Sequence, residues 1–282
     1  MEVKHPLDLI PEIDKLGYVI EEELATVLFL MLRLDKPLLL EGNPGVGKTQ
    51  IGYILSDLLG HELIRLQCYE GLDVNNAIYE WNYQKQLLAI KIREESTLSE
   101  SEKESLIFGD EYLLKRPLLK AISSSERKVL LIDEIDRADE EFEAFLLELL
   151  SDFQISIPEF GTIKANEKPI VILTSNRTRE LSDALKRRCL YHWVNYPSLE
   201  KEVKIINKHI PEVNQKLAEE IANYVKRIRE LKLDKSPGIA ETIDWARGIS
   251  VMNGSDKKLS STLSCLLKSD RDIKIVKEEI FN

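Results

Sequence analysis

The stretch Gly42-Asn43-Pro44-Gly45-Val46-Gly47-Lys48-Thr49 decides how this chain is expected to fold. It matches the Walker A pattern, G-x-x-x-x-G-K-[ST], in which glycines let a turn wrap tightly and point its backbone N–H groups inward. The apolar run Leu38–Leu40 precedes this turn, and Ile51, Ile54, Leu55 and Leu58 follow it at helical spacing. A strand, a glycine-rich turn and a helix in this order predict a phosphate-binding loop, because the positive end of the helix adds to the N–H groups.

Residue types within the turn indicate separate contacts with a nucleotide. Lys48 is expected to reach the β- and γ-phosphates, and the Thr49 hydroxyl is expected to bind Mg²⁺. No Asn-Lys-x-Asp motif for reading guanine is present, so the sequence favours ATP over GTP. The predicted cofactor-binding residues are Gly42, Asn43, Pro44, Gly45, Val46, Gly47, Lys48, Thr49 and Gln50.

A second motif, Leu130-Leu131-Ile132-Asp133-Glu134, has the composition of a Walker B segment. A buried strand here delivers an acidic pair to its carboxyl end. Asp133 is expected to hold Mg²⁺, directly or through water. Glu134 is expected to orient and deprotonate the attacking water as a general base. The two motifs together predict a Mg²⁺-dependent ATPase.

Two further polar groups are candidates for catalysis. Thr174-Ser175-Asn176 ends the next apolar run, where the Asn176 amide could hydrogen-bond the water or the γ-phosphate. The pair Arg187-Arg188 follows a short helical stretch, Glu180–Lys186. Spacing leaves two interpretations of this pair open, a solvated basic patch or an arginine finger for a neighbouring subunit's γ-phosphate.

Short apolar runs without alternation predict strands that are buried on both faces. Helical patterns lie between the runs, so the sequence predicts an α/β fold with a parallel sheet and helices on both faces. The polar clusters follow these strands, and ligands bind such sheets at the carboxyl ends of strands. The clearest runs are Leu38–Leu40, Val129–Ile132 and Ile170–Leu173, and weaker ones are Leu63–Leu66 and Tyr191–Val194.

The chain is expected to divide near Pro197, where strand signals stop. Residues 1–197 form the predicted nucleotide-binding domain, and 198–282 form a predicted helical lid domain with breaks at Pro211, Pro237-Gly238 and Asn253-Gly254. Residues 19–34 suit a helix with acidic residues in its first turn. Two interruptions of the nucleotide-binding domain are an insert at about 73–125, whose charged stretch Glu94–Glu104 suits a solvated loop, and a β-hairpin at about 153–165.

Composition restricts the function further. The net charge of −10 disfavours nucleic acid as a partner, since non-specific binders carry a broad basic face. Three dispersed cysteines and four scattered histidines argue against disulfides and a zinc site. The N-terminus lacks a signal-peptide core, and no apolar run approaches the roughly 20 residues that span a bilayer. We therefore expect a cytoplasmic protein.

The motifs and their order resemble those of the AAA+ ATPases, and within them the MoxR-like family, particularly its CoxD-type branch. The similar stretches are spread over residues 41–248. They are Glu41–Thr49, Tyr79–Leu88 (YEWNYQKQLL), Ile132–Thr162 (IDEIDRADEEFEAFLLELLSDFQISIPEFGT), Leu173–Val194 (LTSNRTRELSDALKRRCLYHWV) and Pro237–Gly248 (PGIAETIDWARG).

The resemblance implies a homo-oligomeric ring, often a hexamer, with ATP at subunit interfaces. It implies that Asn176 is the sensor-1 residue and that an arginine finger acts in trans, with Arg188 fitting best and Arg187 second. It also implies a chaperone-like role with a von Willebrand factor A domain partner and a client enzyme that receives a metal cofactor. One departure is that Gly238-Ile239-Ala240-Glu241 lacks the sensor-2 arginine of many AAA+ proteins, which leaves Arg247 as a candidate substitute.

Two other functions are compatible with the same fold. One is a nucleic-acid motor or loader, which the acidic charge disfavours. The other is a switch or scaffold that binds nucleotide and barely hydrolyses it, against which the intact Glu134 argues.

Overall fold

A computed structural model describes residues 4–92, 108–158, 160–252 and 259–281. The chain divides into two compact units. The first contains Val27–Glu41 and Leu55–His192, and the second contains the chain up to Thr26, Gly42–Ile54 and the chain from Trp193 onward. The predicted domain boundary at residue 197 remains a proposal.

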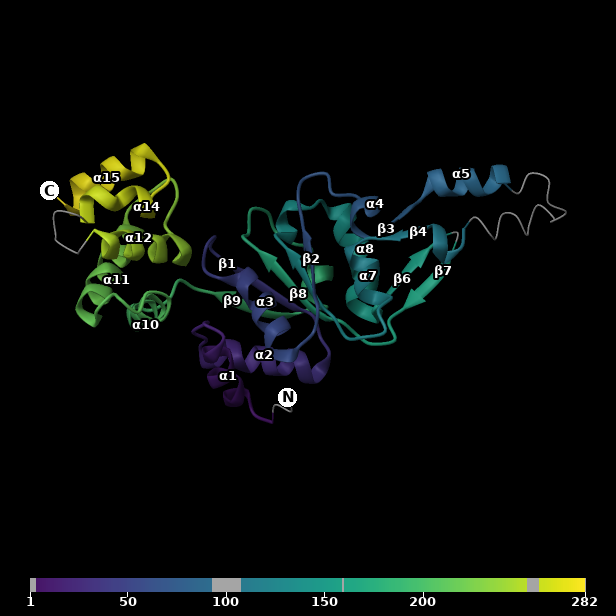
Figure 1. The fold of residues 1–282 in the computed structure, drawn as a ribbon, viewed down its shortest axis with the longest axis horizontal. Coiled ribbons are helices and arrows are strands. Elements are labelled where there is room, and N and C mark those ends of the chain that lie inside the picture. Colours follow the sequence, from purple (N-terminus) through teal and green to yellow (C-terminus); the bar gives the residue numbers. More distant parts are fainter. Residues whose placement is uncertain (1–3, 93–107, 159, 253–258, 282) are drawn as a thin grey trace. The chain divides into compact units, whose positions relative to one another are not determined.

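The predicted α/β fold is confirmed by a five-stranded sheet whose strand order is β2-β5-β8-β1-β9 (Figure 1). The pairs β2·β5, β5·β8 and β1·β8 are parallel. Every residue of the three central strands is buried, which explains why their sequences are apolar without alternation. The strands are β1 (Leu38–Gly42), β2 (Leu63–Gln67), β5 (Val129–Asp133), β8 (Ile170–Ser175) and β9 (Leu190–Val194).

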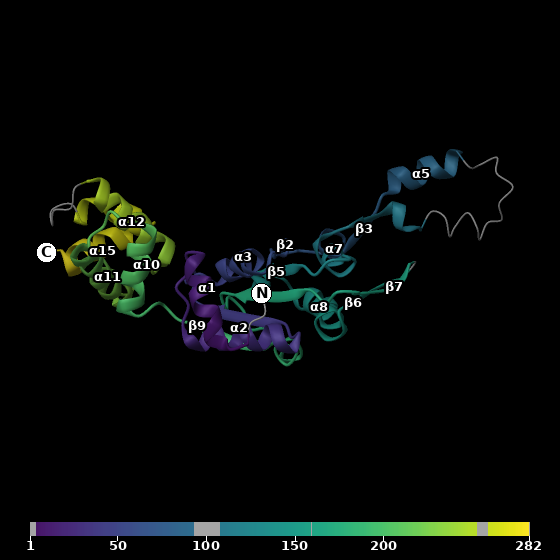
Figure 2. The same ribbon diagram turned by 60° about the horizontal axis from the view of Figure 1, so that its bottom comes forward.

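Helices cover the sheet on both sides, as the alternation of elements predicts. Figure 2 shows α2 (Glu22–Leu34) across the sheet from α7 (Pro117–Ile122). α7 and α8 (Glu140–Asp152) pack into one buried core with strand residues such as Leu39. Their apolar side chains, such as Leu119, Phe142 and Leu146, are at most 2% exposed. The sheet is therefore buried between helices, and Asp133 and Ser175 are the last residues of β5 and β8.

Short elements interrupt this layered arrangement. Between β2 and α7, the strands β3 (Tyr79–Trp81) and β4 (Leu113–Lys115) pair antiparallel, and α5 (Tyr83–Ile92) extends from them (Figure 1). After α8, β6 (Gln154–Ile157) and β7 (Gly161–Lys164) form an antiparallel pair. Smaller elements here are α4 (Val74–Ala77), η2 (Asp110–Tyr112), η3 (Ile135–Arg137) and α9 (Asp183–Lys186), and the charged stretch Glu94–Glu104 lies outside the described residues.

The N-terminal region differs from the predicted pattern in two ways. The helix expected at 19–34 begins at Glu22, so the β-branched residues Val19 and Ile20 precede it. In addition, η1 (Pro6–Asp8) and α1 (Leu9–Lys15) form a short helical segment that the sequence pattern had not indicated. Leu9 and Ile13 are buried, which explains why so short a helix is ordered here.

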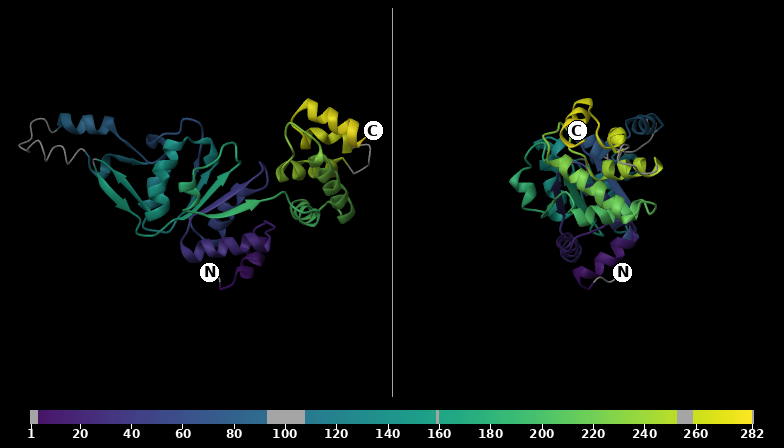
Figure 3. Two further views of the ribbon diagram at one scale, coloured as in Figure 1. Left: turned by 180° about the vertical axis from the view of Figure 1, so that it is seen from behind. Right: turned by 90° about the vertical axis from the view of Figure 1, so that its left-hand side faces the viewer.

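Helices make up the C-terminal region, as predicted (Figure 3). Trp245 lies fully buried in their shared core, and its indole N–H donates to Thr262 Oγ1 at 2.9 Å. The breaks fall near Pro211 and at Pro237-Gly238, whereas Asn253-Gly254 lies outside the described residues. The helices are α10 (Leu199–His209), α11 (Gln215–Glu230), α12 (Ile239–Val251), η4 (Ser260–Thr262), α14 (Leu263–Leu266) and α15 (Asp270–Ile280).

None of the helices in the described part of the chain combines the length and the apolar character that a membrane crossing needs.

Candidate active site

The turn Gly42–Thr49 joins β1 to α3 (Lys48–Leu59), and glycines are required at two of its positions. A Cβ on Gly42 would lie 2.3 Å from the Val194 carbonyl oxygen. Gly45 has φ +76°, and a Cβ there would lie 2.8 Å from Gly238 Cα. The backbone therefore occupies a conformation and a space that a side chain would disturb, as expected for a loop that approaches a ligand closely.

Lys48 is buried and folds back over the turn. Its ammonium donates to the Gly42 and Asn43 carbonyl oxygens, each at 2.8 Å. Lys48 is also the first residue of α3, so its charge lies at the helix N-terminus, where an anion is favoured. Thr49 is half-buried in the first turn of this helix, and Gln50 is exposed beside it.

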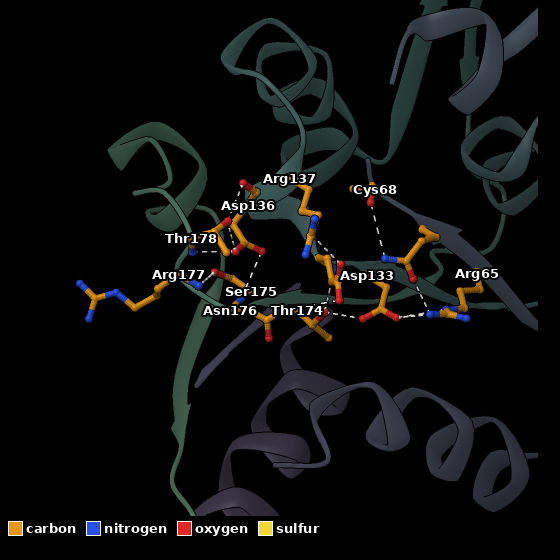
Figure 4. Close-up of polar contacts among 12 residues, drawn as sticks. Arg65, Cys68, Asp133, Asp136, Arg137, Thr174, Ser175, Asn176, Arg177 and Thr178 are labelled. Carbon is orange, nitrogen blue, oxygen red and sulfur yellow. Dashed lines mark hydrogen bonds and ion pairs between the residues drawn. The ribbon is translucent and has the colours of Figure 1, made fainter. Parts of the chain in front are cut away.

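Asp133 ends β5 with both carboxylate oxygens engaged (Figure 4). Oδ1 accepts the Thr174 hydroxyl at 2.5 Å, and Oδ2 accepts Arg65 Nη2 at 2.5 Å and Nε at 3.1 Å. Its side chain is 3% exposed, against 41% for Arg65. Thr174 therefore fixes the carboxylate from β8, and Arg65 neutralises it from β2.

Glu134 follows in a left-handed conformation, φ 54° and ψ 50°. Its N–H donates to Thr174 Oγ1 at 2.9 Å, and its Oε1 accepts Asn176 Nδ2 at 3.4 Å. Oε2 pairs with Arg137 Nε at 2.9 Å, and both side chains of this pair are substantially exposed. Left-handed backbone in a residue other than glycine is strained, and such strain concentrates at functional sites. The structure thus brings the predicted base and the predicted polar amide together.

Asp136 is a member of this cluster to which the sequence analysis gave no role. Its buried carboxylate accepts the N–H groups of Asn176 at 3.2 Å and Thr178 at 2.8 Å, and the Thr178 hydroxyl at 2.7 Å (Figure 4). These bonds hold the loop after β8 against the η3 turn. Asp136 therefore positions the Asn176 backbone.

Glu41 is a second polar residue that sequence reasoning missed. It lies on β1 directly before the glycine-rich turn and is 5% exposed. Its carboxylate accepts the Ser175 hydroxyl and the Tyr191 hydroxyl, each at 3.1 Å. Burial, together with the charge of Glu41, raises the pKa of Tyr191. Glu41 therefore links three neighbouring strands at the carboxyl edge.

Arg187 and Arg188 have different surroundings. Arg188 is half-buried, and its guanidinium donates to Ser151 Oγ at 2.5 Å and to the Ala184 carbonyl at 2.7 Å. Arg187 is exposed at the C-terminal cap of α9. Arg188 is thus held by its own chain, whereas Arg187 extends from the surface.

The N-terminus of α12 contacts the glycine-rich turn through backbone atoms. Ile239 N–H donates to the Gly45 carbonyl at 2.8 Å, and Gly238 N–H donates to Glu241 Oε2 at 3.0 Å. Arg247 is eight positions after Ile239, roughly 12 Å along an α-helix. It lines a shallow surface groove with Asp244, Cys265 and Lys268. The contact with the turn therefore involves no arginine of this helix.

The donor set fits Mg²⁺–ATP. Hydroxyl and carboxylate oxygens, the chemistry of Thr49 and Asp133, are the ligands that Mg²⁺ takes, usually with few protein groups besides phosphates and waters. Among the described residues, no cluster of three or more His, Cys, Asp or Glu side chains could hold a metal ion by itself.

A protein-family model for the AAA domain of the dynein-related subfamily matches residues 37–189. The chain belongs to this family. This AAA protein is similar in fold to two single-substitution variants of RuvB from Thermotoga maritima, each 20% identical, with TM-scores of 0.56 and 0.55. Each alignment covers 94% of this chain and 78% of the RuvB chain.

A further RuvB structure, described as a Holliday junction branch migration motor, is 19% identical, with a TM-score of 0.51. That alignment covers 92% of this AAA protein and 75% of the RuvB chain. At these identities the likeness establishes the fold, and the family match identifies an AAA+ ATPase in general terms.

Proposed function

We propose that this AAA protein binds Mg²⁺–ATP on Gly42–Thr49 and hydrolyses it with Asp133 and Glu134. The observation that carries the proposal is the polar network at the ends of β5 and β8. There Thr174 contacts both Asp133 and the Glu134 N–H, and Asn176 donates to the Glu134 carboxylate. Because β8 also pairs with β1, the parallel register brings the carboxyl ends of these three strands to one edge of the sheet.

Each residue has a role that its chemistry supports. Lys48, which donates to carbonyl oxygens in the turn, would exchange these partners for β- and γ-phosphate oxygens. Thr49 and Asp133 would hold Mg²⁺, which supplies positive charge against the phosphates when bound. The turn would cover the phosphates with backbone N–H groups, and Gln50 would flank it on α3.

Glu134 acts as the general base in this proposal. Asn176 fixes its Oε1, and Asp136 in turn fixes the backbone of Asn176. Arg137 occupies Oε2, but an ion pair this exposed is weak and exchanges readily. The carboxylate is therefore oriented on one side and available on the other for a water proton.

The test compares two variants in one set of measurements. Glu134→Gln is expected to bind ATP with Mg²⁺ at near-normal affinity and to hydrolyse it at least about 100-fold more slowly, since general-base catalysis typically contributes that much. Lys48→Ala is expected to lose ATP binding. Unchanged turnover in Glu134→Gln, or normal affinity in Lys48→Ala, would refute the corresponding assignment.

For the biological role, we propose a MoxR-like, CoxD-type remodeller that works as a homo-oligomeric ring, with a hexamer as the expected size. Several exposed apolar residues on α5 and β4 support a protein partner, since large apolar side chains at the surface are available for contact with another protein. These are Tyr83, Leu87, Leu88, Ile90, Ile92 and Leu114, which are 41–73% exposed.

The partner in this proposal is a protein with a von Willebrand factor A domain, and the client is an enzyme that receives a metal cofactor. We place this activity in the cytoplasm. Co-purification of the tagged Glu134→Gln variant, which would retain ATP, tests for both proteins. A single-strand DNA and RNA binding assay with a salt titration tests the alternative. Tight, salt-sensitive binding that stimulates hydrolysis would favour a nucleic-acid motor or loader.

A further inference from the structure

The Asp133 carboxylate has little acceptor capacity left for a metal ion or its water. An ionised carboxylate offers about four lone-pair positions. Two hydrogen bonds from Arg65 fall on Oδ2, and one from Thr174 falls on Oδ1. These three bonds occupy about three of the four positions. The guanidinium also keeps its positive charge at any physiological pH, so it neutralises the carboxylate permanently.

The sheet register explains how Arg65 reaches Asp133. In the pairing of β2 with β5, Gln67 is opposite Asp133 and Arg65 is opposite Leu131. Side chains two positions apart lie on the same face of a strand, so the Arg65 side chain extends along β2 toward Gln67 and reaches Asp133 diagonally across the strand pair. Gln67 Oε1 accepts a hydrogen bond from Arg65 Nη2, which holds the guanidinium in this direction. Within the part of the chain that the structure describes, β2 is an edge strand of this sheet.

We propose that Arg65 is a positioning residue that competes with Mg²⁺ for Asp133 and so sets the Mg²⁺ concentration at which the nucleotide site is filled. This inference rests on the proposed function of the site. In the metal-free protein, Arg65 places a positive charge beside a carboxylate whose side chain is 3% exposed, which offsets part of the cost of burying that charge. When Mg²⁺ arrives with the nucleotide, the two cations face the same carboxylate. Part of the metal's binding free energy is then consumed in weakening the Arg65–Asp133 pair.

The experiment measures how much MgCl₂ half-saturates the fluorescence change of mant-ADP bound to the full chain. Arg65→Met removes the charge and keeps an apolar side chain of similar reach. It is expected to lower the half-saturating MgCl₂ concentration roughly tenfold, the effect of one partly exposed charge-assisted hydrogen bond. Arg65→Lys keeps the charge without the two-nitrogen contact, so an intermediate value is expected. Arg65→Lys also provides the test if Arg65→Met fails to fold.

The matched control is Arg116→Met. Arg116 also lies 41% exposed in a 2.5 Å ion pair, with Glu80, away from the polar network. It is expected to leave the MgCl₂ dependence unchanged.

Thermal unfolding provides a second readout. Arg65→Met should lower the melting temperature in EDTA and recover part of the loss when MgCl₂ and mant-ADP are added. An equal loss with and without the metal, or an unchanged or higher half-saturating MgCl₂ concentration, would overturn this inference alone. Absence of mant-ADP binding by the unsubstituted protein would overturn the proposed function with it.

Discussion

Removing the Arg229 guanidinium is expected to destabilise the C-terminal helices because it leaves a buried charge alone. Glu202 on α10 and Arg229 on α11 form two hydrogen bonds, of 2.7 and 2.8 Å, and their side chains are 2% and 8% exposed. Arg229 Nε also donates to the Pro237 carbonyl at 2.9 Å. Breaking a buried pair by removing one partner typically costs about 3–5 kcal/mol. Thr242 keeps a 3.0 Å hydrogen bond to Glu202, so we expect the lower end of this range, about 3 kcal/mol.

Hydrogen exchange measured by mass spectrometry provides the assay, since it reports local stability without requiring a two-state transition. In Arg229→Met, the protected amides of α11 and α12 should exchange on the order of 100-fold faster, as about 3 kcal/mol implies. Lys274→Met removes a fully exposed pair with Asp270 on α15 and should leave these rates unchanged. The double variant Arg229→Met with Glu202→Leu should recover much of the protection, because an apolar pair needs no counter-charge. Rates within threefold of the unsubstituted protein in Arg229→Met would refute the reasoning.

Two further predictions concern the arginine pair and two cysteine thiols. Arg188→Ala should lose ATP turnover and keep ATP binding, and Arg187→Ala should have a smaller effect on turnover. If Arg188 acts as an arginine finger across subunits, mixing Arg188→Ala protein with Lys48→Ala protein should restore some activity. Absence of rescue at every mixing ratio would contradict a finger in trans. Cys68 and Cys189 should resist maleimide at pH 8 in the native protein and react after unfolding in urea, because burial raises the pKa of both thiols from 9.0 to about 12. Since the unfolded thiols lose protons first, the free energy of unfolding should fall as the pH rises from about 9 to 12. Rapid labelling of either thiol in the native state, followed by mass spectrometry, would contradict the burial argument.

The sheet and its glycine-rich turn could be predicted because local sequence determines them. The uninterrupted apolar runs became the three central strands, and the weaker runs became β2 and β9. In contrast, β3 and β4 have three residues each, too few for a periodicity to be recognised. The η1–α1 segment escaped notice for the same reason.

The partners of the site residues depend on tertiary structure. Arg65 precedes Asp133 by 68 positions, and a single basic residue in a strand is ordinarily a solvated one. The alternation of Arg65 and Gln67 with apolar neighbours was the available signal, and it became meaningful once β2 was known to pair with β5. Asp136 and Glu41 likewise resembled surface charges until the sheet edge brought hydroxyl and N–H donors to them.

The approach of Gly238 to Gly45 limits how evolution or design can adjust this protein. A methyl group on Gly238 would lie 2.7 Å from Gly45 Cα, and a methyl group on Gly45 would lie 2.8 Å from Gly238 Cα. A larger residue at one position therefore cannot be compensated by a smaller residue at the other, because both are already glycine. The hydrogen bond from Ile239 N–H to the Gly45 carbonyl joins main-chain atoms, so it has no side chain to vary. Substitutions that change how α12 responds to the phosphate-binding loop must therefore lie elsewhere, among the residues that hold α12 against α10 and α11. Libraries that vary Glu202, Arg229 and Thr242 should explore that response, whereas libraries that vary the two glycines should yield mostly inactive protein.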